Sequence, residues 1–320
     1  MKCALPIALF GLAMCLASLP ASAFAAVESD IVLKTATGNI DGTLMLAGKR
    51  PSPIVLIIAG SGPTDRNGNS LGLTTDAYKL LAADLARVGI SSVRYDKRGI
   101  GASKAAGPPE QDLRFETYVN DAVDWTNLLH ADSRFSRVVI AGHSEGSLIG
   151  IVASQRAPVS ALVSLEGAGR PAATVLREQL KPKLSADLYA KADAALTLIQ
   201  AGHSVTDTPP QLAALFRPSV QPYLISWLKY DPAVEIAKLH IPVTIVQGTA
   251  DIQVSMEDAI ALKSAGKSFR FLVIHGMNHV LKHAPNTSTQ AAIAKGYTDP
   301  ALSVEANVVR AITDAAQLGH

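Results

Sequence analysis

Residues 138–151 read VVIAGHSEGSLIGI, two apolar runs that flank a short polar segment. The first run is typical of a buried strand and the second of a helix, so the segment between them must turn the chain sharply. Gly142 and Gly146 let neighbouring backbone pass close to such a turn. The segment therefore predicts a sheet whose strands run into helices, with Ser144 projecting from the turn.

Other runs along the chain fit the same sheet. Apolar, β-branched runs with the length of buried strands lie at 54–58, 90–95, 161–165, 243–246 and 271–274. Helix-like spacing of apolar residues occurs at 76–88, 115–129, 148–153, 256–265 and 301–316. Strands that alternate with helices predict a doubly wound, mostly parallel α/β sheet. Before it, segments 31–34 and 43–46 predict an antiparallel hairpin joined through Gly38 and Gly42.

The first 25 residues are predicted to be a secretory signal peptide. Lys2 gives a positive start, residues 4–19 are apolar, and small residues follow. The apolar stretch is shorter than the roughly 20 residues that a spanning helix needs, so we expect cleavage and no stable membrane insertion. The two cysteines, Cys3 and Cys15, lie in this segment, so the mature chain has no disulfide. We expect a periplasmic or secreted protein.

Composition narrows the class of partner. The formal net charge is +2, and no block of like charge marks a surface for nucleic acid. The histidines and cysteines show no metal-ligand spacing, so we expect no metal and no other cofactor. The expected partner is a small molecule.

Residues 171–240 break the alternation of strands and helices. This stretch has no run typical of a buried strand, is rich in helix-forming residues and contains several prolines. A structureless loop of that length is uncommon in a compact domain, so we interpret it as a helical cap. The predicted core then comprises residues 26–170 and 241–320.

A serine hydroxyl needs a base, and the base needs an orienting acid, before it can act as a nucleophile. On this type of sheet these groups follow in the order serine, acid, histidine. Asp251 comes just after the strand-like run 243–246, and His279 just after the run 271–274. Adjacent parallel strands bring such loops together at one edge of the sheet. The sequence therefore predicts a triad of Ser144, His279 and Asp251.

Several other residues are alternatives for these roles. Glu166 also follows a strand-like run and is the second candidate for the acid, whereas Asp258 is expected to face solvent on its helix. His275 ends a strand and is a candidate core histidine, and His283 is expected at the surface. His143, beside the nucleophile, is expected to point away from the reacting face.

An acyl-transfer site also needs two N–H donors for the oxyanion. One is expected to be the amide of Glu145, the residue after the nucleophile. The other is expected in the glycine-rich loop 59–69, and we assign it to the amide of Ser61.

Taken together, these motifs resemble the α/β-hydrolase superfamily. Residues 94–103, RYDKRGIGAS, look like the Asp-x-Arg-Gly-x-Gly-x-Ser turn after the fourth strand of that superfamily. The loop GSGPTDR, residues 60–66, is similar to that of bacterial esterases with a serine-aminopeptidase-like (S33-type) domain, although Ala59 stands where a histidine is usual. The resemblance implies a serine hydrolase fold over the mature chain.

We expect a serine carboxylesterase that forms an acyl-enzyme on Ser144. A peptidase or amidase with the same triad is the alternative enzyme, and an acid such as Asp187, Asp193 or Glu166 that captures an amine would favour it. A non-catalytic binding protein that uses the cleft as a receptor is the alternative from another class.

The glutamate next to the nucleophile poses a separate question. Its side chain is not needed for the chemistry, and a carboxylate about 5 Å from the developing oxyanion would cost roughly 3 kcal/mol at an effective dielectric near 20. We therefore predict that the Glu145 carboxylate turns away and pairs with a cation such as Arg98 or Arg66, rather than standing solvated in the cleft.

Overall fold

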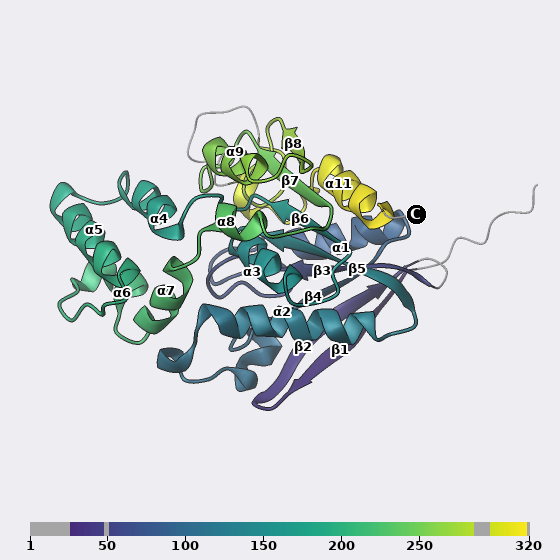
Figure 1. Ribbon diagram of the computed structural model, residues 1–320, viewed down its shortest axis with the longest axis horizontal. Helices are drawn as coiled ribbons and strands as arrows, with labels where there is room; N and C mark the ends of the chain where they lie inside the picture. The colour runs from purple at the N-terminus through teal and green to yellow at the C-terminus, as the bar shows by residue number, and fades with distance from the viewer. Residues whose placement is uncertain (1–25, 48–50, 285–294, 319–320) are drawn as a thin grey trace, which may run out of the picture.

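The computed structural model describes residues 26–47, 51–284 and 295–318, so the predicted signal peptide lies outside the described residues. One eight-stranded sheet runs through the molecule in the order β1-β2-β4-β3-β5-β6-β7-β8, with helices on both faces (Figure 1). The predicted doubly wound, mostly parallel sheet is confirmed.

The parallel part of the sheet holds six strands. These are β3 (Ser52–Ile58), β4 (Ser91–Tyr95), β5 (Phe135–His143), β6 (Ala161–Leu165), β7 (Val243–Gly248) and β8 (Arg270–Ile274). Each corresponds to one of the apolar runs in the sequence. Because β7 and β8 are parallel neighbours, the loops that follow them lie at the same edge of the sheet.

The N-terminal hairpin is longer than the sequence suggests. Strands β1 (Val27–Thr35) and β2 (Gly38–Leu46) pair antiparallel over nine residues each, and β2 pairs antiparallel with β4. Gly38 lies at the turn, with a φ of 138°, but Gly42 lies inside β2 opposite Tyr95. A Cβ on Gly42 would come within 3.2 Å of the Trp125 ring, so this glycine serves packing and not the connection.

Two helical layers cover the sheet. Helices α2 (Phe115–His130), α3 (Glu145–Ser154) and α9 (Met256–Ser264) belong to the apolar core of one face, and α1 (Ala77–Arg87) and α11 (Ala306–Gln317) to that of the other. Helix α11 begins five residues later than expected, because the chain before it turns at Pro300 and Val304 bridges to Lys282.

Residues 171–240 contain helices and no strand. The helices are α4 (Ala172–Leu180), α5 (Ala186–Gln200), α6 (Ala213–Phe216), α7 (Gln221–Leu228) and α8 (Pro232–Ile236). Helices α4 to α7 stand to one side of the sheet (Figure 1) and enclose an apolar cluster that includes Leu196, Phe216 and Leu224. This helical segment therefore has its own small core.

Candidate active site

Ser144 lies on the strained turn between β5 and α3. Its φ of 55° and ψ of −121° are unusual for a residue with a side chain, and α3 begins at the next residue. A Cβ on Gly142 would collide with the backbone of Gly146, and one on Gly146 would collide with the carbonyl of Ile58. The two glycines are thus required for the strand, the turn and the helix to approach this closely.

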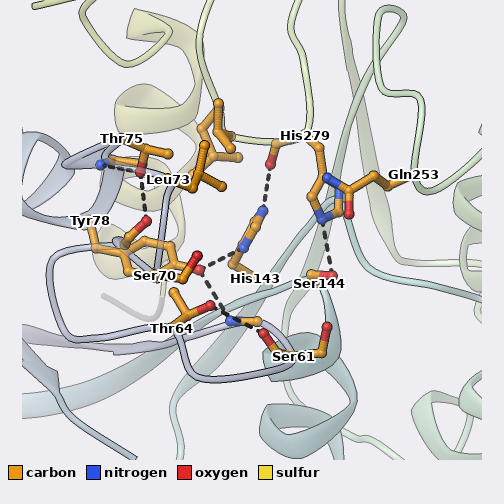
Figure 2. A pocket seen from close by; sticks show the side chains of 15 residues that line it. Ser61, Thr64, Ser70, Leu73, Thr75, Tyr78, His143, Ser144, Gln253 and His279 are labelled. Carbon is orange, nitrogen blue, oxygen red and sulfur yellow. Dashed lines mark hydrogen bonds between the residues drawn. The ribbon is translucent and has the colours of Figure 1, made fainter. Parts of the chain in front are cut away.

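Three of the predicted residues form one series of hydrogen bonds. His279 Nε2 lies 3.1 Å from Ser144 Oγ, a contact drawn in Figure 2, and His279 Nδ1 lies 2.7 Å from Asp251 Oδ2. Asp251 and His279 come from the loops after β7 and β8, and the Asp251 side chain is fully buried. The structure therefore brings together the three side chains that the sequence predicts to be nucleophile, base and acid, although they lie far apart in the chain.

The surroundings of Asp251 favour its ionised form. Burial would raise the pKa of this carboxyl, but the hydrogen bond and charge of His279, a hydrogen bond from Glu166 and the backbone N–H of Gln253 together hold it below the usual value. Oδ1 accepts from the N–H groups of Gln253 at 2.7 Å and Val254 at 3.0 Å. An ionised Asp251 can orient His279 and stabilise its charged form.

Glu166, the second candidate for the acid, lies behind Asp251. It is fully buried with a φ of 49°, and its Oε1 accepts from the N–H of Gly248 at 2.8 Å. Burial, the charge of Asp251 and a hydrogen bond to that carboxylate raise its pKa to about 11. Glu166 is therefore protonated at neutral pH and donates to Asp251, whereas Asp251 is the carboxylate that bonds His279.

Replacing Glu166 by glutamine is expected to flatten the pH dependence of unfolding. The folded pKa near 11 exceeds the ordinary value of 4.5, so folding takes up a proton at neutral pH. This stabilisation is complete below pH 4.5 and is lost as the pH rises, by about 1.4 kcal/mol per pH unit. Glutamine keeps an N–H donor and an acceptor but has no proton to lose. Urea unfolding of both proteins from about pH 6 to about pH 9 measures the two slopes; equal slopes would mean that Glu166 is ionised in the folded state.

Two side chains are placed differently from the prediction. Asp258 is fully buried and does not face solvent, because its carboxylate accepts from Arg170 at 2.8 Å and from the Ser255 hydroxyl at 2.9 Å. His275 is exposed and is no core histidine, since β8 is an edge strand. His283 lies at the surface, as expected, next to Glu305.

The two assigned oxyanion donors lie beside Ser144. Ser61 and Glu145 line the same cavity as the nucleophile, and a Cβ on Gly60 would lie 3.2 Å from Ser144 Cβ. Within the described ranges, neither N–H has a hydrogen-bond acceptor. Because Glu145 is the first residue of α3, its N–H also carries the positive end of the helix dipole. Both amides are thus free to bind an anion.

A buried chain of hydrogen bonds connects the loop after β3 with the loop of His279. The N–H of Gly60 donates to Tyr78 Oη at 3.1 Å, Tyr78 Oη lies 2.7 Å from His143 Nδ1, and His143 Nε2 lies 2.6 Å from the carbonyl of His279 (Figure 2). A carbonyl only accepts, so Nε2 of His143 carries the proton and Nδ1 accepts from Tyr78. Burial lowers the pKa of His143 to about 3, which keeps the ring neutral. Nothing in the sequence pattern singled out Tyr78.

Neither of the two arginines suggested for the Glu145 carboxylate is its partner. Arg98 pairs with Asp121, and Arg66 pairs with Asp96 at 2.9 Å. Glu145 is buried and not solvated, and its Oε2 lies 3.6 Å from the ammonium of Lys97. The carboxylate is held by a cation, but by the lysine that precedes Arg98 in the chain.

Two cavities meet at Ser144, and they differ in polarity. The first is lined largely by hydroxyl groups and ring nitrogens, among them Ser61, Thr64, Ser70, Thr75, Tyr78 and His143 (Figure 2). The second lies against the helical segment and is the more apolar of the two, although Arg170 and Gln179 also line it. Its apolar lining residues are Leu148, Ala172, Val175, Leu176, Trp227, Pro232 and Val254. Ser61, Ser144 and Gln253 line both. A molecule bound across Ser144 would therefore place its two halves in different environments.

The described residues contain no candidate metal cluster and no candidate membrane span. No group of three or more histidine, cysteine, aspartate or glutamate side chains there is arranged to hold a metal ion. No helix in the same ranges combines the length and the apolar character needed to cross a bilayer.

Comparison with known proteins gives one family match. The family model described as serine aminopeptidase, S33, matches residues 71–215, which include Ser144 but neither Asp251 nor His279. Esterase EstD of Thermotoga maritima is 28% identical over 276 residues, which cover 85% of this chain and 64% of that protein. The chain thus spans a little less than two thirds of the length of this relative.

Solved structures with the same architecture include a further esterase. Est1E from Butyrivibrio proteoclasticus, with ferulic acid bound, superposes with a TM-score of 0.58 at 16% identity over 88% of this chain and 99% of the other. A thermophilic esterase from Thermogutta terrifontis has a TM-score of 0.54 at 16% identity over 90% and 97% of the two chains. At these identities the likeness establishes the fold.

Proposed function

We propose that this chain, an α/β-hydrolase by its fold, is a serine hydrolase that cleaves carboxylic esters through an acyl-enzyme. The observation that carries the proposal is the hydrogen-bonded series from Ser144 through His279 to Asp251, with two unpaired amide N–H groups beside the nucleophile. The match to EstD supports an ester over other acyl substrates.

In the first half of the reaction, Ser144 Oγ attacks the acyl carbon while its proton moves to Nε2 of His279. The negative charge that develops on the carbonyl oxygen is bound by the N–H groups of Ser61 and Glu145. When the tetrahedral intermediate collapses, the bond to the alcohol oxygen breaks and His279 gives its proton to that oxygen. The free alcohol leaves, and the acyl group remains on Ser144.

In the second half, a water molecule takes the place of the alcohol. His279 Nε2 removes a proton from this water as its oxygen attacks the acyl carbon, and the same two amides bind the oxyanion. Collapse of this intermediate breaks the bond to Ser144 Oγ, which recovers its proton from His279. Asp251 stays ionised throughout and stabilises the imidazolium in both halves.

The two cavities support a division of the substrate. We assign the acyl chain to the apolar cavity, where Leu148, Val175 and Trp227 replace water around it. We assign the alcohol to the polar cavity, where hydroxyl groups can bind oxygen atoms of the leaving group. In this role the helical segment acts as a cap, since its helices α4, α7 and α8 supply one wall of the acyl cavity.

The alternative activity, an aminopeptidase, is favoured by the description of the matching family model. Capture of a substrate amine needs a carboxylate that faces the site. Of the described residues that line the two cavities, only Glu145 has one, and it is engaged by Lys97 and Tyr223. Asp193 pairs with Arg177 outside both cavities, and Glu166 is protonated behind Asp251. These contacts support an ester, and not an aminoacyl amide, as the substrate.

A side-by-side assay tests the choice of substrate. We expect the kcat/KM for p-nitrophenyl acyl esters to exceed that for the matching aminoacyl p-nitroanilides by at least about 10²-fold, since no acid is free to bind the amine. A fluorophosphonate probe is expected to label Ser144, with loss of fluoride as the phosphorus–oxygen bond forms. Faster anilide cleavage would assign an aminopeptidase, and failure to label Ser144 would point to a non-catalytic receptor.

We also propose that the mature protein acts in the periplasm or outside the cell. The support is the sequence alone: a positive start, an apolar run and small residues within the first 25 positions, and no cysteine after them.

A further inference from the structure

Lys97 is a buried cation that the proposed chemistry does not use. It comes two residues after the end of β4 and is 1% exposed. Lysine is almost never fully buried unless its ammonium has partners, so the contacts of this group need an explanation. Those contacts lead to the two peptide groups assigned to the oxyanion.

The Lys97 ammonium bonds to the loop that carries Ser61. Its Nζ donates to the carbonyl of Gly60 at 2.6 Å, and it also lies 5.0 Å from the centre of the Tyr118 ring. The other side of Gly60 is held too, because its N–H donates to Tyr78. The residue before Ser61 is therefore fixed at both of its peptide groups.

The carbonyl of Gly60 and the N–H of Ser61 belong to one peptide group. In a trans peptide the C=O and the N–H lie in one plane and point in opposite directions. A lysine bound to the carbonyl oxygen thus fixes the direction of the Ser61 N–H on the far side of the same plane. A charged donor on the oxygen also polarises the peptide group, which strengthens the N–H as a hydrogen-bond donor.

Glu145 connects the same lysine to the turn that carries the nucleophile. Its Oε2 lies 3.6 Å from Lys97 Nζ, and both side chains are at least 97% buried. Its Oε1 accepts from Tyr223 Oη of α7 at 2.6 Å. Burial lowers the pKa of Lys97, and the Glu145 carboxylate opposes that shift. The Glu145 carboxylate, which the proposed reaction does not need, is thus the counter-ion of Lys97.

We propose that Lys97 is a positioning residue for the oxyanion hole. By binding the carbonyl oxygen of Gly60, Lys97 keeps the N–H of Ser61 directed toward the reacting carbonyl of the substrate. The ion pair with Glu145 connects Lys97 to the turn that carries Ser144. One buried ion pair therefore sets the distance between the two oxyanion donors, the N–H groups of Ser61 and Glu145. This inference rests on the proposed function, because it assigns a role in the same acyl transfer. Tyr223 extends the connection to the helical segment.

The test compares the single variants Lys97→Met and Glu145→Gln with the double variant. Lys97→Met removes the donor to Gly60 and is expected to lower kcat for p-nitrophenyl acetate by about 10²-fold with little change in KM, the size of effect seen when an oxyanion donor is lost. Glu145→Gln leaves Lys97 on Gly60, so its loss in kcat is expected to stay below about tenfold. In the double variant no buried charge is left unpaired, so it is expected to regain stability but not kcat.

The double variant separates positioning from folding. If Lys97 only stabilises the fold, the thermal midpoint and kcat recover together in the double variant, and that result overturns the proposal. A Lys97→Met enzyme with kcat within about threefold of wild type overturns it as well.

A second readout keeps this test independent of the choice of ester. The rate at which a fluorophosphonate labels Ser144 also depends on the oxyanion donors but needs no ester substrate. We expect Lys97→Met to lower this rate in parallel with kcat. A wild-type protein that is labelled but cleaves no ester would contradict the proposed function, while the labelling rate of the variant still decides the role of Lys97.

Discussion

Replacing Ser144 by alanine is expected to lower kcat for p-nitrophenyl acetate by about 10⁶-fold, the loss typical when the nucleophile of such a triad is removed. In the proposed reaction the hydroxyl oxygen of Ser144 forms the acyl bond, and His279 Nε2 lies 3.1 Å from it, so neither His279 nor Asp251 could act without it. The two amide donors remain in the variant, so a small rate above that in water is expected to persist.

The controls for this variant are its stability and its ligand binding. Alanine occupies the same strained backbone conformation as serine and loses only one hydrogen bond, so the thermal midpoint is expected to change little. The variant is expected to bind a product carboxylic acid with the same affinity as the wild type. A variant that folds normally and still turns over the ester at a rate within about tenfold of wild type would remove Ser144 from the chemistry.

The core of the site could be predicted from the sequence because its parts are local. The turn at Ser144 shows in five consecutive residues, since only glycine permits the close approaches at 142 and 146. Asp251 and His279 each follow an apolar run, and parallel neighbours carry such loops to one edge of a sheet. The boundary between a strand and the loop after it can be predicted from a few neighbouring residues. The three boundaries before Ser144, Asp251 and His279 were enough to place these residues at one site.

Partners that depend on tertiary packing could not be predicted. Lys97 and Arg98 are adjacent in the sequence, yet one turns to Gly60 and Glu145 and the other to Asp121. Both side chains are buried, and no periodicity tells which of two neighbouring cations turns toward the loop of Ser61 after a strand ends. Asp258 was misplaced for the same reason, because Arg170, far away in the sequence, is the group that draws it inward.

The helical segment illustrates another limit of prediction from sequence. Its prolines and leucines predict helices, but it contributes to the site through Val175 of α4 together with Tyr223 and Trp227 of α7. Their meeting depends on how α4 and α7 pack on each other and on the nucleophile turn. A pattern within one helix carries no information about that geometry.

Asp251→Asn is expected to lower kcat by about 10⁴-fold, because it reverses the hydrogen bond that sets the tautomer of His279. In the wild type the carboxylate accepts from Nδ1, which leaves Nε2 free to take the proton of Ser144. An asparagine amide that donates to Nδ1 would instead place the ring proton on Nε2, which could then no longer act as a base. The variant keeps the shape of the site, so ester binding is expected to survive while turnover is lost.

Glu166→Gln is the matched control for that variant, because it alters the other buried acid after a neighbouring strand. Glutamine can still donate to Asp251 and accept from the N–H of Gly248, so the loss in kcat is expected to stay below about tenfold. If Glu166 were the acid of the triad, the two variants would exchange their effects. The ratio of their kcat values therefore decides between the two carboxyl groups, and it does so without any assumption about the natural ester, since both are measured on the same substrate.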